Sequence, residues 1–159
     1  MTSGLLPAVA IALAISATLA LAAEGPTRAE YKATVEPICK ENSEANEHIL
    51  KGVRSKVRRG KLGPAGRQFT RASSALQKAL RQLKAVPKPP ADEARLTEWL
   101  KRVGDQAALL QKVGKALIVK DRHKAETLSV KLVTGARLTN AIVVSFGFHY
   151  CRFEPSKYT

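Results

Sequence analysis

Apolar residues recur at three- and four-residue steps along most of this 159-residue chain, as they do on one face of an α-helix. No convincing strand pattern appears. Clusters of glycine and proline interrupt the helical spacing and divide it into four stretches. The pattern therefore predicts four helices joined by short connections.

Each predicted helix carries its own apolar stripe. The first opens at residues 26–30 and bears Tyr31, Val35, Ile38, Ile49, Val53 and Val57. After a break at residues 60–66, the second bears Phe69, Ala72, Leu76, Ala79, Leu80 and Leu83, and it ends at residues 87–90. The third starts at Asp92 and bears Leu96, Trp99, Leu100, Val103, Ala107, Leu110 and Leu117. The fourth is capped by Asp121, ends at Gly147 and bears Leu128, Leu132, Ala136, Val143 and Phe146.

Local signals agree with these boundaries. Thr27 and Glu30 have the spacing of a capping box at the start of the first helix, whereas Pro37 should kink that helix or shift its start. Four helices with short links predict an all-α fold, an antiparallel up-down-up-down four-helix bundle. The β-branched run at residues 141–146 leaves a short strand as the alternative there.

The first 23 residues have the features of a secretory signal. Residues 5–23 contain no charge and end in small residues that suit a cleavage site, although no Lys or Arg precedes the run. We expect residues 1–23 to be a signal peptide, residues 24–152 a helical bundle domain and residues 153–159 a short C-terminal tail. An uncleaved N-terminal anchor is the alternative, since the run approaches the length that spans a bilayer.

Two cysteines, Cys39 and Cys151, lie near the two ends of the expected mature chain. An even count in a small exported protein favours one structural disulfide, which would join the first helix to the C-terminal tail. In a bundle of this topology the first and fourth helices are neighbours, so the bridge would pin the tail against the first helix. The alternative is a pair of free thiols, with Cys151 activated by His149 as a nucleophile.

The charge of the chain is very uneven. Its net charge is +14, and nearly all of it lies between His48 and Ala91, where twelve Lys or Arg occur without a single Asp or Glu. Such a block is typical of a surface that binds an anionic polymer or membrane. The candidate anion-binding residues are Lys51, Arg54, Arg58, Arg59, Lys61, Arg67, Arg71, Lys78 and Arg81. The alternative is a solvated surface whose charge only promotes solubility.

The start of the second helix is the sharpest point in this block. It carries Arg67 and Arg71 but no acidic residue, although cations are unfavourable near the positive end of the helix dipole. One hypothesis is that free backbone amides after Pro64, together with Lys61, Arg67 and Arg71, bind a phosphate or carboxylate, although the glycine spacing matches no phosphate-loop pattern. The alternative is a flexible glycine turn with the arginines in water.

Asn42 and Asn46 project into the apolar stripe of the first helix, where buried amides need partners. One interpretation is a hydrogen-bonded pair that meets Asn140 or Thr139 and fixes the register of the helices. The other is an interior polar site that orients a small ligand. The first is the expected one.

Other chemistry finds little support. The three histidines lie far apart in the sequence and lack carboxylate neighbours at metal-binding spacing, so we expect no metal site. No nucleophile, phosphate-loop or dinucleotide-binding motif occurs, so we expect neither a cofactor nor catalytic residues, and an enzyme is the class with least support.

The two cysteine segments, Tyr31-Lys-Ala-Thr-Val-Glu-Pro-Ile-Cys39 and Phe146-Gly-Phe-His-Tyr-Cys151, carry a resemblance. They resemble the ends of a loosely defined group of small exported helical proteins from actinobacteria, in which a YxxxxxxIC-type start and a YGFxxC-type end bracket a helical body. The resemblance covers the mature chain and implies the bundle and the bridge, but no activity or ligand. Phe146 stands where that group usually has Tyr.

The sequence thus predicts a basic binding module that is secreted or associated with the cell envelope. Its basic hairpin of helices one and two would bind an anionic envelope component, either a wall polymer or an acidic lipid surface. Nucleic acid would bind only through non-specific electrostatics. The alternative is a structural or small-ligand-binding bundle whose charge serves solubility.

Overall fold

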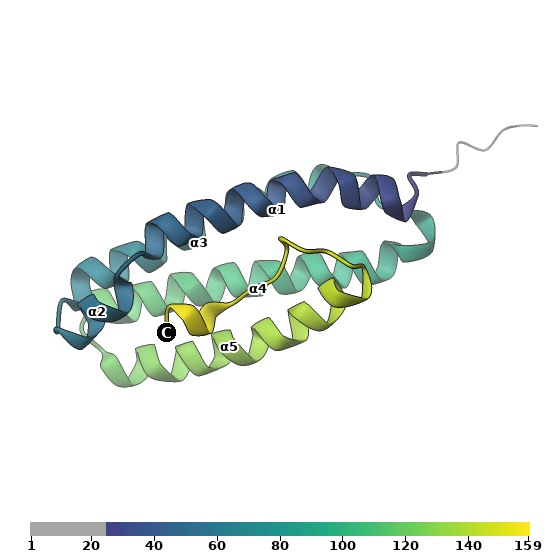
Figure 1. Ribbon diagram of the computed structural model, residues 1–159. Coiled ribbons are helices and arrows are strands. Elements are labelled where there is room, and N and C mark those ends of the chain that lie inside the picture. The colour runs from purple at the N-terminus through teal and green to yellow at the C-terminus, as the bar shows by residue number, and fades with distance from the viewer. Residues whose placement is uncertain (1–24) are drawn as a thin grey trace, which may run out of the picture.

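The computed structural model describes residues 25–159, and its regular secondary structure is entirely helical, with no strand among these residues (Figure 1). Its elements are α1 (Arg28–Leu50), α2 (Val53–Arg58), α3 (Leu62–Ala85), the 3-10 helix η1 (Pro90–Asp92), α4 (Glu93–Ile118), α5 (Arg122–Ser145) and the 3-10 helix η2 (Pro155–Lys157). Four long helices pack together, which confirms the predicted all-α bundle. The run at residues 141–145 belongs to α5, so the alternative of a strand there is wrong. The expected signal peptide lies outside the described residues.

The start of α1 follows the predicted capping box. The Thr27 side chain accepts a hydrogen bond from the Glu30 amide, and the Glu30 carboxylate accepts one from the Thr27 amide at 2.8 Å. Pro37 lies inside the helix on its exposed side, so it does not shift the start. A side chain thus satisfies amides that the first turn of every helix leaves without intrahelical partners.

The first helix is shorter than its apolar stripe predicts, because the chain breaks at Gly52. This glycine has a φ of +72°, a left-handed conformation that other residues rarely adopt, and α2 begins after it. The buried side chain of Gln68 supports the break, since its Nε2 donates to the carbonyl oxygens of Ile49 (2.6 Å) and Lys51 (3.1 Å). These carbonyls lie at the end of α1, where intrahelical donors are missing.

The segment at residues 60–66 is not the linker that its glycines suggest. It begins as a turn, but α3 starts at Leu62 and includes Gly63, Pro64 and Gly66. Gly66 lies where α3 crosses α4: a Cβ added there would be 2.5 Å from the carbonyl oxygen of Gly114. The two glycines therefore allow the helix backbones to approach closely, which side chains at these positions would prevent.

The long helices pack in chain order, α1 on α3, α3 on α4 and α4 on α5, and alternate in direction (Figure 1). The C-terminal segment after α5 lies between α5 and α1, so the tail lines the space where direct contact of these helices was expected. A disulfide joins Cys39 of α1 to Cys151 of the tail, as predicted. Asn140 of α5 also holds the tail, through two hydrogen bonds of 2.8 Å with the Phe153 backbone. The expected tail at residues 153–159 thus packs on the bundle rather than extending from it.

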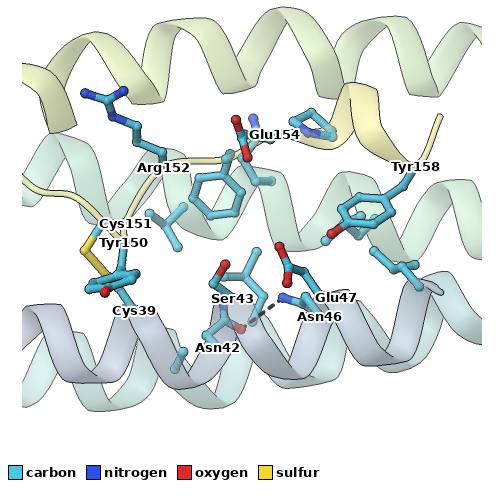
Figure 2. A pocket seen from close by; sticks show the side chains of 18 of the residues that line it. Cys39, Asn42, Ser43, Asn46, Glu47, Tyr150, Cys151, Arg152, Glu154 and Tyr158 are labelled. Carbon is cyan, nitrogen blue, oxygen red and sulfur yellow. Dashed lines mark hydrogen bonds between the residues drawn. A yellow bond between two sulfur atoms is a disulfide. The ribbon is translucent and has the colours of Figure 1, made fainter.

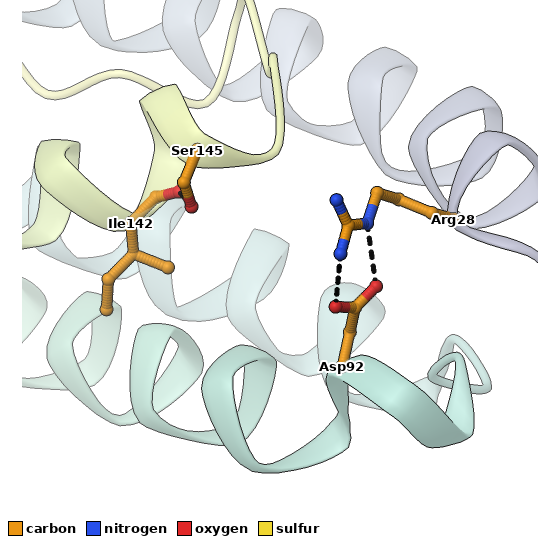
Figure 3. A network of polar contacts seen from close by, with 4 residues as sticks. All are labelled: Arg28, Asp92, Ile142 and Ser145. Carbon is orange, nitrogen blue, oxygen red and sulfur yellow. Dashed lines mark hydrogen bonds and ion pairs between the residues drawn. The ribbon is translucent and has the colours of Figure 1, made fainter.

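An ion pair closes the end of the bundle where α1 begins. The Arg28 guanidinium donates to both carboxylate oxygens of Asp92, at 2.6 and 2.8 Å (Figure 3). Hydrogen bonding from Arg28 holds the pKa of the Asp92 carboxyl below its usual range. The guanidinium also lies over the Phe146 ring, 5.0 Å from its centroid. The start of α1 is thus tied both to the start of α4 and to the end of α5.

Candidate functional site

The nine basic residues that the sequence singles out are all exposed. They extend along the molecule, from a group around α2 and the start of α3 to the later turns of α3. Arg67 and Arg81 are fourteen residues apart on one helix, or about 21 Å along its axis. Lys78 also lies 3.7 Å from Glu41, so part of its charge is already compensated. The basic residues therefore extend along α2 and α3 rather than gathering at one point.

The anion site expected from free amides after Pro64 does not form. The amide of Ala65 already donates to the carbonyl oxygen of Lys61 at 3.2 Å, and the following residues lie within α3. Gly66 is buried against α4. The first turn of α3 does lack an acidic residue, as the sequence indicates. The amides that were expected to bind the anion, however, already donate to backbone carbonyl oxygens.

The group around α2 borders a groove between α2 and α5, with a volume of about 690 Å³. Phe69, Val113 and Leu117 of α3 and α4 form its floor and are buried in the core, whereas Val57, Val130 and Val133 are its accessible apolar side chains. Four arginines line it as well: Arg54, Arg58, Arg122 and Arg137. Glu126 is the only acidic side chain among the lining residues, so the groove combines an apolar lining with an excess of positive charge.

None of the four groove arginines forms an ion pair with any residue between 25 and 159. Figure 1 shows why α2 and α5 share this surface, since α2 lies at the same end of the bundle as the turn from α4 to α5. That turn exposes Val119, which is 73% accessible, and Val130 on α5 is 66% accessible. Cations without partners thus lie beside exposed apolar side chains.

Arg122 and Arg137 were missed by the sequence reasoning. They lie more than 60 residues beyond α2, in a part of the chain where acidic residues also occur, and no local feature marks them. Only the packing of α5 on α4 brings them to α2. The groove is therefore a product of tertiary structure.

A second cavity, of about 90 Å³, lies between α1 and the C-terminal segment (Figure 2). Asn42, Ser43 and Asn46 of α1 point toward it. The predicted amide pair is present, with Asn46 Nδ2 donating to Asn42 Oδ1 at 3.1 Å. It does not meet Asn140 or Thr139: Asn140 binds the tail, and the Thr139 hydroxyl donates to the carbonyl oxygen of Gly135 at 2.9 Å.

Two further polar side chains reach this cavity from α4. Gln106 and Trp99 both line it and are only 2% and 1% exposed. The sequence reasoning did not identify Gln106. Its position could have been noticed, because it is a polar residue within the apolar stripe of α4, between Val103 and Leu110. At the mouth of the cavity, burial and, secondarily, the charge of Glu47 raise the pKa of Tyr158. Figure 2 shows the Tyr158 ring turned toward Glu47.

Two other kinds of site can be compared with the described residues, a metal centre and a thiol nucleophile. Among residues 25–159 no three His, Cys, Asp or Glu side chains gather as a metal site. Cys151 is bonded to Cys39, so the alternative of an activated thiol nucleophile is wrong. Near it, the amides of His149 and Tyr150 donate to the two carboxylate oxygens of Glu36, which fixes the tail on α1.

Comparisons with protein-family models, curated proteins and solved structures found no match to this chain. The resemblance of the cysteine segments to exported actinobacterial proteins therefore stays a prediction. No helix within residues 25–159 is both long and apolar enough to cross a bilayer. The candidate sites thus rest on the geometry of the chain itself.

Proposed function

We propose that this protein is an exported binding module that attaches to acidic lipid headgroups through the groove between α2 and α5. The observation that carries the proposal is the arrangement of Arg54, Arg58, Arg122 and Arg137 along a groove with an apolar lining. Export is supported by the signal-like sequence of residues 1–23 and by the disulfide, which is typical of oxidising compartments.

The four arginines can supply a useful binding free energy. A Lys or Arg near an anionic membrane surface contributes about 1 kcal/mol, so the four arginines together would contribute about 4 kcal/mol at moderate salt. Binding to lipid breaks no existing ion pair of these arginines, because none has an ion-pair partner among residues 25–159. Long arginine stems also cover apolar surface while their guanidinium groups stay in water, as at a membrane interface.

The apolar lining favours lipid over a wall polymer. A phosphate-bearing polymer offers charge but little apolar surface, so it would leave the accessible side chains of Val57, Val130 and Val133 in the groove without a partner. A lipid supplies both groups, and each buried methylene contributes about 0.8 kcal/mol. Exposed Val119 and Val130 at the same end would insert at the boundary between headgroups and acyl chains.

Co-sedimentation with phosphatidylglycerol vesicles, phosphatidylcholine vesicles and purified cell walls tests the proposal at low and physiological salt. We expect retention on the phosphatidylglycerol vesicles that falls as salt screens the charges. The double variant R122Q/R137Q should bind these vesicles about thirtyfold more weakly, because it loses about 2 kcal/mol of this attraction. The matched control R71Q/R81Q removes the same charge from α3 outside the groove and should bind within about twofold of the unmodified protein.

The other outcomes are informative. Equal losses in both double variants would mean that diffuse charge, not the groove, binds the membrane. Retention on cell walls alone would assign the partner to a wall polymer. Absence of retention on every phase would refute the proposal and leave the charge a role in solubility only.

A further inference from the structure

The last long helix, α5, differs from the other helices in the side chains that it exposes. Among residues 25–159 six large apolar side chains are exposed, and three of them, Val130, Leu138 and Val144, belong to α5. Their accessible fractions are 66%, 55% and 56%, whereas α1 and α3 expose no large apolar side chain. A helix that is apolar on more than one face is normally covered on each of them. The core covers one face of α5, so the outer face points to a partner.

The exposed apolar residues of α5 form a continuous stripe. At the angular spacing of an α-helix, Val130, Leu138 and Val144 lie within an arc of about 120°. Thr134 and Ala141 are also exposed and lie within this arc. These five residues, named here the α5 stripe, extend for about 21 Å along the helix axis. The stripe is therefore as long as a helix contact rather than a single exposed side chain.

Positive charge borders the α5 stripe on both sides. Between its first and last residues α5 carries four Lys or Arg but a single acidic residue, Glu126. The four cations are all exposed. In projection Arg137 lies within the stripe and Arg122 beside one edge, whereas Lys124 and Lys131 lie beside the other edge. An apolar stripe bordered by cations is typical of a helix that lies in the interface of an anionic membrane.

The same charges disfavour a second copy of this chain as the partner. A contact between two α5 stripes would bring together four cations from each copy, and each chain has a net charge of +14. Like charges repel, so such a contact would be opposed at low salt. An acidic lipid surface instead offers both the negative charge and the apolar phase.

We propose that α5 lies lengthwise on an acidic membrane, with the α5 stripe inserted at the boundary between headgroups and acyl chains. This inference rests on the proposed function and extends its contact beyond the groove. Val130, Thr134 and Arg137 line the groove and also lie on the outer face of α5, so the two surfaces are continuous. Figure 1 shows α5 along one edge of the bundle. The bundle therefore lies on its side on the membrane rather than standing on the end that carries α2.

Quenching of tryptophan fluorescence by brominated lipid tests this orientation in the oxidised protein. V130W, L138W and V144W each add an indole to the α5 stripe, and vesicles of phosphatidylglycerol with brominated acyl chains quench an indole that enters them. The native Trp99 is only 1% exposed, so it gives a constant background. We expect quenching of all three added tryptophans. The control S74W should not be quenched, because Ser74 is exposed on α3, which packs mainly on α1 and α4.

The double variant L138Q/V144Q separates the apolar contact from the charges. It should weaken retention on phosphatidylglycerol vesicles about tenfold at low and at physiological salt alike, because salt does not screen apolar contacts. R122Q/R137Q should instead lose most of its affinity at low salt, where the charges act most strongly. Y150Q is the control, because it removes an exposed apolar ring that lies on the C-terminal segment, and it should bind within about twofold of the unmodified protein.

The possible failures can be told apart. Quenching of V130W without quenching of L138W and V144W would mean that the bundle stands on the end that carries α2, which overturns this inference but leaves lipid binding by the groove intact. Absence of vesicle binding by the unmodified protein would refute the proposed function and this inference together. Sedimentation velocity without lipid supplies the last test. A dimer that L138Q/V144Q abolishes would assign the α5 stripe to a second copy of the chain and overturn its assignment to lipid.

Discussion

The close crossing of α3 and α4 at Gly66 and Gly114 predicts that replacing glycine by alanine has opposite effects at two sites. The substitution should destabilise the protein at Gly66 and stabilise it at Gly104. Alanine in place of glycine inside a helix normally stabilises it by about 1 kcal/mol. Gly104 of α4 should follow this rule, because a Cβ there would meet only the Leu80 side chain, at the ordinary contact distance of 3.4 Å. We expect G104A to stabilise the protein by about 0.5 to 1 kcal/mol.

G66A should instead destabilise the protein. The added Cβ would lie 2.5 Å from the Gly114 carbonyl oxygen and 2.9 Å from the Ile118 amide nitrogen, and backbone atoms cannot rotate away. Restoring a contact of 3.4 Å requires the helices to separate locally by roughly 1 Å, which forfeits much of the surrounding dispersion energy. Overpacking of this kind costs about 1 to 3 kcal/mol, and clashes with backbone belong at the upper end. After the gain in propensity, the net loss should be about 2 kcal/mol.

Urea unfolding followed by far-ultraviolet circular dichroism measures both variants on the same scale. With a slope of about 2 kcal/mol/M, the midpoints of G66A and G104A should differ by more than about 1 M, with the unmodified protein between them. An unchanged slope would show that the denatured state is unaffected. If G66A unfolds at the same urea concentration as G104A, the close approach of α3 and α4 is not a constraint on the fold and our account of Gly66 fails.

Three further predictions concern other parts of the bundle. Burial raises the pKa of the Tyr31 hydroxyl to about 12 and leaves it without a partner. Because tyrosine ionises near pH 10 in the unfolded chain, Tyr31 should lower stability by about 2 to 3 kcal/mol between about pH 10 and 12. Y31F should remove this contribution from alkaline denaturation curves and leave that of Tyr158, whose pKa is also raised. The Asp92 carboxyl has a lowered pKa in the folded state, so its stabilising effect is present above its unfolded pKa and is lost as pH falls through the folded value. Thermal melts should therefore show a steeper loss of stability on acidification below about pH 4 for the unmodified protein than for D92N. The bond between Cys39 and Cys151, which are 112 residues apart, restricts the entropy of the unfolded chain. Its reduction should therefore cost about 5 kcal/mol in urea unfolding, whereas an unchanged midpoint would contradict this reasoning.

The sequence predicted the helices well because their stripes depend on local spacing alone. It failed at Gly52, since Ile49, Val53 and Val57 keep helical spacing across the break and conceal it. It also failed at Gly66. Glycine has low helix propensity, and only the position of Gly114 on another helix shows that close packing requires it.

The candidate sites were predictable only in part. The amide pair of Asn42 and Asn46 was visible as polar residues in an apolar stripe, and Gln106 could have been found by the same rule. Arg122 and Arg137 could not, because their proximity to α2 depends on how α5 packs. Charge density along a sequence shows where cations are numerous, whereas a groove depends on which helices lie together.

Both candidate sites follow from the way the fourth side of this bundle is closed. Helices packed side by side fill the space between them with regularly spaced side chains and leave few voids. Between α1 and α5, however, the chain places an irregular segment that is held by the disulfide and by Asn140. Such a segment lacks regular ridges that fit helix grooves, so polar side chains of α1 and α4 face a cavity rather than apolar neighbours. The segment ends at Tyr158, which borders the cavity on one side and the groove on the other. The four long helices can therefore pack in the ordinary way, because both sites lie along the side of the bundle that the C-terminal segment closes.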